Sequence, residues 1–202
     1  MASDLWGLLS AREGHFRYES GYHASLWFDL DPLYRDPAAL APLITRLADQ
    51  CWPYRPKVIC GPLVGGAFVA LRAAEALGVG FAYTERHLNP AESGLFPVEY
   101  RLPTGLRAIV AGKRTVILDD VISAGSAVRG TYESVTAAGA EVVAVGALLG
   151  LGDTGSGWFA AKGIPALALE ARANPIWSPQ ECPLCAAGSP LEDFTPEGNT
   201  SA

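Results

Sequence analysis

Two adjacent carboxylates, Asp119 and Asp120, stand just before a turn of small residues. They follow the apolar run Thr115–Leu118, which is typical of a buried strand, and open α/β sheets bind ligands where such strands end. The turn, Ser123–Ala127, leads directly into a helical pattern. Small side chains let backbone N–H groups close on a phosphate, and a helix N-terminus adds partial positive charge. We therefore expect a phosphomonoester in the turn and hydroxyl groups near the carboxylates, and a ribose 5-phosphate has both.

The segment lacks two common nucleotide-binding motifs. It has no Gly-Lys-Ser/Thr of an ATPase P-loop, and it lacks the Gly-x-Gly-x-x-Gly spacing of a dinucleotide site. A strand whose acidic end only caps a helix, in another kind of α/β protein, would give a similar pattern. That structural alternative stays open at this point.

The elements around the segment alternate between strand and helix patterns. Apolar runs predict strands at residues 58–60, 79–83, 115–118, 141–149 and 164–171, and helical spacing predicts helices from Asp36-Pro37, over Ala67–Leu77 and over Ser126–Ala138. Apolar strands that alternate with helices indicate a mostly parallel central sheet flanked by helices. The polar stretch Thr84–Gly112 is rich in Pro and Gly and is expected to be a long loop that serves as a lid.

Composition excludes several classes of function. Half of the 202 residues are hydrophobic, so a full core is possible, and the net charge of −6 argues against a nucleic-acid partner. No apolar run approaches the roughly 20 residues of a membrane span, and the N-terminus lacks the apolar region of a signal peptide. We expect a soluble, cytoplasmic protein that has no membrane partner.

The sequence of Val116–Ala127, VILDDVISAGSA, resembles the signature by which type I phosphoribosyltransferases bind 5-phosphoribosyl-1-pyrophosphate (PRPP). That signature has four apolar residues, two acids, two variable residues and Thr/Ser-x-Gly-Thr/Ser. The resemblance implies that Asp119 and Asp120 contact the ribose 2- and 3-hydroxyls, directly or through Mg2+. The residues that would surround the 5-phosphate are Ser123, Ala124, Gly125, Ser126 and Ala127. Ser123 and Ser126 stand where the family usually has Thr, which keeps the hydroxyl.

An earlier glycine-containing turn resembles the pyrophosphate loop of the same family. Its residues are Pro62, Leu63, Val64, Gly65 and Gly66. Glycine lets the backbone approach a diphosphate closely. An ordinary strand-to-helix turn explains this loop equally well when it is considered alone, but its distance upstream of the PRPP signature suits the family.

The N-terminal residues resemble the hood of orotate phosphoribosyltransferases, which has Phe-x-x-x-Ser-Gly-x-His followed by an aromatic residue and an acid. Here Phe16–His23 precedes Trp27-Phe28-Asp29. The resemblance implies that Ser20 and His23 contact the base, although a structural hairpin would give the same pattern. We expect a phosphoribosyltransferase domain over residues 1–176, in which 1–35 contribute to the hood, and a C-terminal segment with a flexible tail over 177–202.

The sequence departs from the orotate branch where that branch has a lysine-rich lid. The matching stretch, Tyr83–Pro90, contains no lysine, and Arg86 is its main catalytic candidate. His87, Arg101 and Arg107 are further cations nearby. One Arg can bind a diphosphate through two hydrogen bonds, but losing several charges would weaken transition-state stabilisation.

The resemblance implies a transferase that moves the phosphoribosyl group of PRPP to a nucleobase, with Mg2+ and without a covalent intermediate. Orotate is the favoured base, which would give orotidine 5′-phosphate and pyrophosphate in pyrimidine biosynthesis. A purine as the base is one alternative, and a non-catalytic sensor of PRPP or nucleotide is another. A homodimer is expected from the family, in which the lid often completes the neighbouring site.

Cys182 and Cys185 form a single Cys-x-x-Cys pair near the C-terminus. One such pair is half of a tetrahedral zinc site, and Cys51, Cys60, the three histidines or a dimer partner could supply the other ligands. Inert or redox-sensitive thiols are the alternative. Four cysteines in a chain of this length do not make a disulfide scaffold, which favours a reducing compartment.

Overall fold

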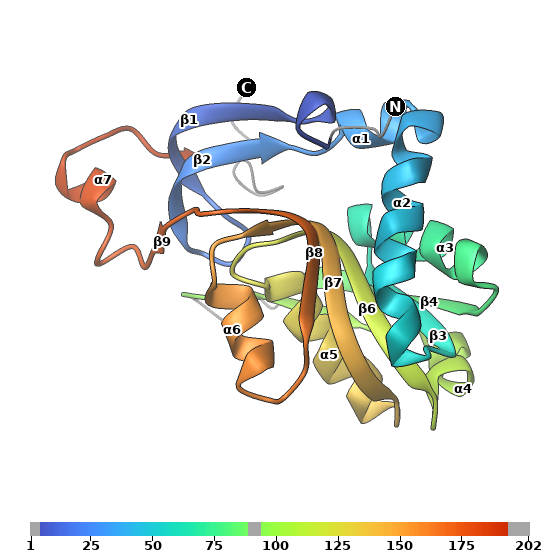
Figure 1. Cartoon of the computed structure of the whole chain (residues 1–202). Helices are drawn as coiled ribbons and strands as arrows, with labels where there is room; N and C mark the ends of the chain where they lie inside the picture. Colours follow the sequence, from blue (N-terminus) through green and yellow to red (C-terminus); the bar gives the residue numbers. More distant parts are fainter. Residues whose placement is uncertain (1–4, 89–93, 194–202) are drawn as a thin grey trace.

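The computed structural model describes residues 5–88 and 94–193, which form two sheets (Figure 1). The larger sheet has six strands in the order β5-β4-β3-β6-β7-β8. Its strands are β3 (Val58–Pro62), β4 (Gly80–Leu88), β5 (Val98–Arg101), β6 (Arg114–Ile122), β7 (Glu141–Leu151) and β8 (Ala166–Arg172). All neighbours in this sheet are parallel except β4 and β5, which are antiparallel.

Helices cover both faces of the larger sheet (Figure 1). One face carries α2 (Pro37–Cys51) and α3 (Gly65–Leu77), and the other carries α4 (Arg107–Val110), α5 (Ser126–Ala137) and α6 (Thr154–Ala160). Successive strand side chains point to opposite faces, so Val116 and Leu118 pack with α2 and α3, whereas Ile117 packs with α5. This arrangement confirms the predicted mostly parallel sheet flanked by helices.

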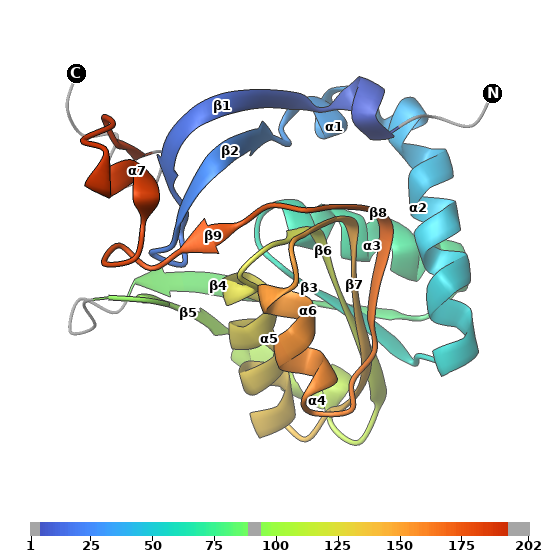
Figure 2. The same ribbon diagram turned by 60° about the vertical axis from the view of Figure 1, so that its left-hand side comes forward.

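The smaller sheet has the strand order β10-β1-β2-β9, and we call it the hood. Its strands are β1 (Ser10–Arg17), β2 (His23–Asp29), β9 (Ile176–Trp177) and β10 (Glu192–Asp193). β1 and β2 form an antiparallel hairpin that arches above the larger sheet (Figure 2). The short helical elements around the two sheets are η1 (Leu5–Leu8), α1 (Pro32–Arg35), η2 (Trp52–Tyr54), η3 (Thr104–Leu106) and α7 (Pro183–Ala186).

The prediction of a long loop over Thr84–Gly112 is wrong for the residues that the structure describes. β4 continues to Leu88, and β5 pairs with it before η3 and α4 follow. β5 is stabilised because Val98 and Tyr100, at alternate positions, are both buried. A four-residue strand among prolines and glycines carries too short an apolar pattern to be recognised. Residues 89–93, also within the expected loop, lie outside the described residues.

The C-terminal segment contributes two strands to the hood. β9 pairs antiparallel with β2, and β10 pairs parallel with β1. Glu192 and Asp193, within the segment expected to carry a flexible tail, therefore form a paired strand, whereas residues 194–202 lie outside the described residues. The division at residue 176 stays a prediction. None of the helices in the described ranges is long and apolar enough to cross a membrane.

Candidate active site

A cavity of about 490 Å³ lies between the hood and the loops that follow β3 and β6. Most of the site residues predicted from the sequence line it, although they come from four separate segments. They are Ser20, Pro62, Leu63, Val64, Gly65, Gly66, Arg86, Asp119, Asp120, Ser123, Ala124, Gly125, Ser126 and Ala127. Parallel strands end at one edge of a sheet, which is why β3 and β6 bring their loops together there.

The turn Ser123–Ala127 joins β6 to α5 and forms one wall of the cavity. Gly125 has φ = 83° and immediately precedes the helix, a backbone conformation that side chains other than glycine rarely adopt. The Ser123 hydroxyl is buried and has no hydrogen-bond partner in the described part of the chain. Because buried polar groups are normally paired, this hydroxyl is available to a ligand beside the helix N-terminus.

Asp119 and Asp120 lie near the end of β6, where the backbone and one tyrosine hold them. The N–H of Asp120 donates to Asp119 Oδ1 over 2.9 Å, and the Tyr34 hydroxyl donates to Asp120 Oδ2 over 2.8 Å. Burial raises the pKa of Asp119, and the adjacent Asp120 carboxyl raises it further. Burial also raises the pKa of Asp120, against the opposing effect of the hydrogen bond from Tyr34. Such a pair favours binding of hydroxyl donors or a cation.

The loop Pro62–Gly66 between β3 and α3 packs directly against these carboxylates. The peptide bond between Leu63 and Val64 is cis, and the Leu63 N–H donates to the Thr84 carbonyl over 2.8 Å. A Cβ atom at Gly65 would overlap the Asp120 carboxylate, and one at Gly66 would lie 2.5 Å from Asp119 Oδ1. Glycine is therefore required for the close approach of the loop to the acids.

Glu19, in the turn between β1 and β2, links the hood to the cavity floor. Its carboxylate accepts hydrogen bonds from Arg86 Nε at 2.8 Å, from the Tyr100 hydroxyl at 2.9 Å and from Ser126 Oγ at 3.3 Å. Burial raises the pKa of the Tyr100 hydroxyl, and Glu19 raises it further. A carboxylate therefore interacts with Arg86 and Ser126, two of the groups predicted to bind the phosphates of PRPP.

Comparison with known proteins settles the family. Residues 31–165 match the family model described as the phosphoribosyl transferase domain. The chain belongs to this family. An orotate phosphoribosyltransferase of Heliobacterium modesticaldum is 34% identical to this phosphoribosyltransferase over 184 residues, which cover 88% of this chain and 87% of that protein. One of Desulforamulus reducens is 30% identical over 177 residues, which cover 88% and 85% of the two chains.

Solved structures have the same fold at lower sequence identity. The orotate phosphoribosyltransferase of Aeropyrum pernix superposes on this phosphoribosyltransferase with a TM-score of 0.63 and 20% identity, covering 82% of this chain and 88% of that chain. The adenine phosphoribosyltransferase of Thermoanaerobacter pseudethanolicus superposes with a TM-score of 0.59 and 23% identity, covering 73% and 88%. At this level of identity the likeness concerns the fold alone.

The cavity of this phosphoribosyltransferase is strongly acidic. Arg86 is the one cationic side chain among its described lining residues. The carboxylates that line it are Glu19, Asp29, Asp31, Asp119 and Asp120. Arg101, which the sequence offers as a further cation, does not line the cavity and instead pairs with Glu99 at 2.7 Å. Within this lining, an anionic ligand would find its attractive contacts at Arg86 and at backbone N–H groups of the two loops.

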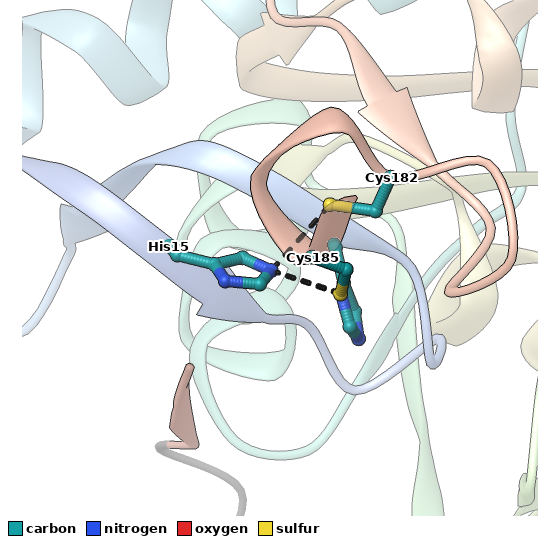
Figure 3. A group of neighbouring side chains, drawn as sticks. His15, Cys182 and Cys185 are labelled. Atoms are coloured by element: carbon teal, nitrogen blue, oxygen red, sulfur yellow. Dashed lines mark hydrogen bonds between the residues drawn. The ribbon is translucent and has the colours of Figure 1, made fainter. Parts of the chain in front are cut away.

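His23 lies outside the cavity, although the sequence pattern suggested contact with the base. Its ring is buried at the start of β2 and lies 3.0 Å from His15 Nε2 and 3.2 Å from Cys185 Sγ. Ser20 does line the cavity because it occupies the hairpin turn rather than a strand. Cys182 and Cys185 face His15 as well (Figure 3), and the four side chains form a group that could hold a metal ion.

Sequence patterns did not predict three residues that contact the site residues of the cavity. Glu19 was visible only as a variable position in the hood pattern, and Tyr34 and Tyr100 belong to no motif. Tyr34 reaches Asp120 from α1, and Tyr100 reaches Glu19 from β5. Contacts of this kind depend on the tertiary fold, and no local spacing signals them.

Proposed function

We propose that this phosphoribosyltransferase transfers the phosphoribosyl group of PRPP to orotate and releases pyrophosphate. The observation that carries the proposal is that one cavity is lined by the acid pair and by both loops expected to bind phosphates. Sequence relatives that cover most of the chain and are named orotate phosphoribosyltransferases support orotate as the base.

Each part of PRPP has a matching segment in the cavity. The 5-phosphate would bind in the turn Ser123–Ala127, where the buried Ser123 hydroxyl supplies a free donor. Asp119 and Asp120 would accept hydrogen bonds from the ribose hydroxyls. The pyrophosphate would lie along Pro62–Gly66 and reach toward Arg86, because glycine leaves the backbone accessible there.

Mg2+ fits the donor set of this site. Mg2+ prefers carboxylate oxygens together with substrate phosphates, and Asp119 and Asp120 present adjacent carboxylates to the cavity. These two residues would hold the ion directly or through the ribose hydroxyls. When bound, Mg2+ supplies positive charge that stabilises the departing pyrophosphate.

The reaction exchanges one bond at the ribose C1 atom for another. The bond from C1 to the pyrophosphate oxygen breaks and the ribose develops oxocarbenium character. A base nitrogen forms the new bond from the opposite face, and its proton is lost to solvent. The chain contributes position and charge: the turn fixes the ribose phosphate, Arg86 faces the leaving group, and carboxylates such as Glu19 lie near the developing positive charge. No nucleophilic side chain is required.

The base would bind between the ribose site and the inner face of the hood. Tyr18, Trp27 and Phe28 line this part of the cavity and offer apolar surface to a planar ring. The Ser20 hydroxyl is buried and has no partner within the described residues, so it is free to hydrogen-bond the base.

A purine is the second candidate, and the acidity of the same wall favours it. Asp29 and Asp31 would repel the carboxylate of orotate but would accept hydrogen bonds from a base that carries amino groups. Arg86 is the one cationic side chain among the described lining residues that could offset this repulsion. Base identity therefore depends on which of these charges faces the bound base.

A parallel assay of pyrophosphate release distinguishes the two candidates. Purified protein, PRPP and Mg2+ would be combined separately with orotate, uracil, adenine, guanine and hypoxanthine. We expect turnover with orotate and a kcat/KM at least about 100-fold lower for the other bases. Turnover with adenine or guanine alone would move the assignment to a purine, and no turnover with any base would contradict both candidates.

We also propose that the protein forms a homodimer that buries an apolar strip of α3. Phe68 and Leu71 lie one turn apart on this helix and are exposed, as is Val64 just before it. Light scattering is expected to give twice the mass of one chain, and Leu71→Glu should reduce that mass to one chain. A monomeric wild-type protein would contradict this proposal.

A further inference from the structure

We propose that His15, His23, Cys182 and Cys185 bind one zinc ion that fastens the C-terminal segment to the hood hairpin. The ligands come from β1, from β2 and from the turn that begins α7, so residues about 160 positions apart in the chain meet at one point (Figure 3). Two cysteines and two histidines are a common ligand set of structural zinc sites.

The spacing of the four atoms is close to that of the ligands of tetrahedral zinc, and small side-chain shifts would complete the site. All lie within 4.8 Å of one another. His15 Nε2 is 3.0 Å from His23 Nδ1, 3.4 Å from Cys182 Sγ and 3.6 Å from Cys185 Sγ. Bond lengths of about 2.0 Å to nitrogen and about 2.3 Å to sulfur at tetrahedral angles give separations of about 3.3–3.8 Å between ligand atoms.

A carbonyl group orients one of the imidazole rings for metal binding. His15 Nδ1 lies 3.0 Å from the Ser189 carbonyl oxygen, which can only accept a hydrogen bond. The proton of the neutral ring therefore lies on Nδ1, and Nε2 presents its lone pair to His23, Cys182 and Cys185. Zinc-binding histidines characteristically donate their other ring nitrogen in this way.

Hydrogen bonding cannot use all of the short contacts in this cluster at once. Three groups approach the lone pair of His15 Nε2, and Cys185 Sγ approaches both His15 Nε2 and His23 Nδ1. The side chains of His15, His23 and Cys182 are buried, which makes unsatisfied polar atoms costly. One cation at the centre accepts a lone pair from all four atoms at once.

The Cys-x-x-Cys turn also has the local geometry of a metal-binding knuckle. Cys182 precedes the first turn of α7, and its carbonyl accepts the Ala186 N–H over 3.1 Å. That turn brings Cys182 and Cys185 to the same side of the segment. Cys51 and Cys60 are buried in the two separate cores of the larger sheet and take no part.

The zinc site would act at a distance on the base-binding wall. His15 and His23 flank the hairpin turn that carries Glu19 and Ser20, and both of these residues line the cavity. The C-terminal segment joins the hood through two strands of only two residues each, which gives little pairing energy by itself. Zinc would supply the missing cross-link, as in small metal-stabilised domains.

Metal analysis of the full-length protein tests the proposal without relying on turnover. After gel filtration with zinc present and then removed, we expect about one zinc per chain by mass spectrometry of the metals. Cys182→Ala combined with Cys185→Ala should reduce zinc to background, as should His15→Gln. Cys51→Ala and His87→Gln are matched controls that should keep the full zinc content. Background zinc in the wild type, or unchanged zinc in the double variant, would overturn the site.

A measurement on the wild-type protein covers the case in which the variants do not fold. Replacement of zinc by Co2+ should give the visible absorption of tetrahedral cobalt with thiolate ligands. A thiol reagent followed by peptide mass mapping should modify Cys182 and Cys185 only after a chelator has removed the metal. Modification at the same rate with and without metal, or a disulfide between the two cysteines in the purified protein, would contradict the proposal.

Discussion

The turn after β6 and the hood hold their candidate site residues by different means. Asp119–Ala127 is one continuous stretch that includes the end of β6 and the start of α5, and the core on both faces of β6 fixes its backbone. The hood turn that carries Glu19 and Ser20 depends on contacts such as that between His15 and Cys182, which are 167 positions apart. Damage to the hood should therefore impair recognition of the base while PRPP binding is largely kept, whereas damage to the turn should abolish both.

The largest effect should follow from removing the acid pair. Asp119→Asn combined with Asp120→Asn should lower kcat/KM for PRPP by about 100- to 1000-fold, because the ribose and metal contacts are lost while the shape is kept. Steady-state kinetics measures this, with Asp193→Asn in the hood as the control. Activity within a factor of about three of wild type would remove the acids from the mechanism.

A glycine substitution tests the close contact between the loop Pro62–Gly66 and the acid pair. Gly66→Ala places a methyl group against Asp119, so we expect a loss of about 10- to 100-fold in kcat/KM. Gly157→Ala in α6 is the matched control, since a Cβ atom there meets nothing within 4 Å. If the two variants are equally active, the close packing of the loop against the acid pair is not required for activity.

Loss of the proposed zinc site should separate the two regions most clearly. Cys182→Ala combined with Cys185→Ala is expected to raise the KM for the base by roughly tenfold and to change the affinity for PRPP by less than about threefold. Base-dependent kinetics and calorimetric titration of PRPP measure the two quantities, with Cys51→Ala as the control. If the variant binds the base and PRPP more weakly by the same factor, the hood also supports the proposed phosphate sites.

Glu19 should oppose PRPP binding, because its carboxylate interacts with Arg86 and Ser126. Glu19→Gln removes the charge and should tighten PRPP binding by about two- to fivefold, since fewer like charges face the phosphates. Calorimetric titration compares this variant with Glu13→Gln on the exposed part of β1. Weaker PRPP binding by the Glu19 variant would instead make this residue part of the binding site.

The smallest effect should be on stability. The pKa of Asp119 is raised in the folded protein, so its contribution to stability is present below the unfolded pKa and lost as the pH rises through the folded pKa. Asp119→Asn keeps a side-chain oxygen that can accept the hydrogen bond from the Asp120 N–H, and it has no carboxyl group whose ionisation would lower stability as the pH rises. Its free energy of unfolding should exceed that of wild type at neutral pH, and urea titrations should show the excess shrinking toward pH 4. If the extra stability of the variant instead grew as the pH fell, the pKa of Asp119 would not be raised in the folded protein.

The same difference between the regions explains what the sequence could predict. VILDDVISAGSA carries strand, acids, turn and helix start in consecutive residues, so its place in the cavity could be inferred from local pattern. The cysteine pair was recognisable, but His15 and His23 could not be chosen from the possible further ligands, because strand pairing brings these two together. Likewise, β5 was missed because its pattern spans only four residues, and burial of Tyr100 is decided by the tertiary fold.

Product formation from PRPP and orotate tests the central claim most directly. Wild-type protein and the Asp119→Asn, Asp120→Asn double variant would be incubated with both substrates and Mg2+, and the products separated and identified by mass. We predict equal amounts of orotidine 5′-phosphate and pyrophosphate from the wild type and almost none from the double variant. Absence of the nucleotide from the wild-type reaction, or its undiminished formation by the variant, would contradict phosphoribosyl transfer at this acid pair.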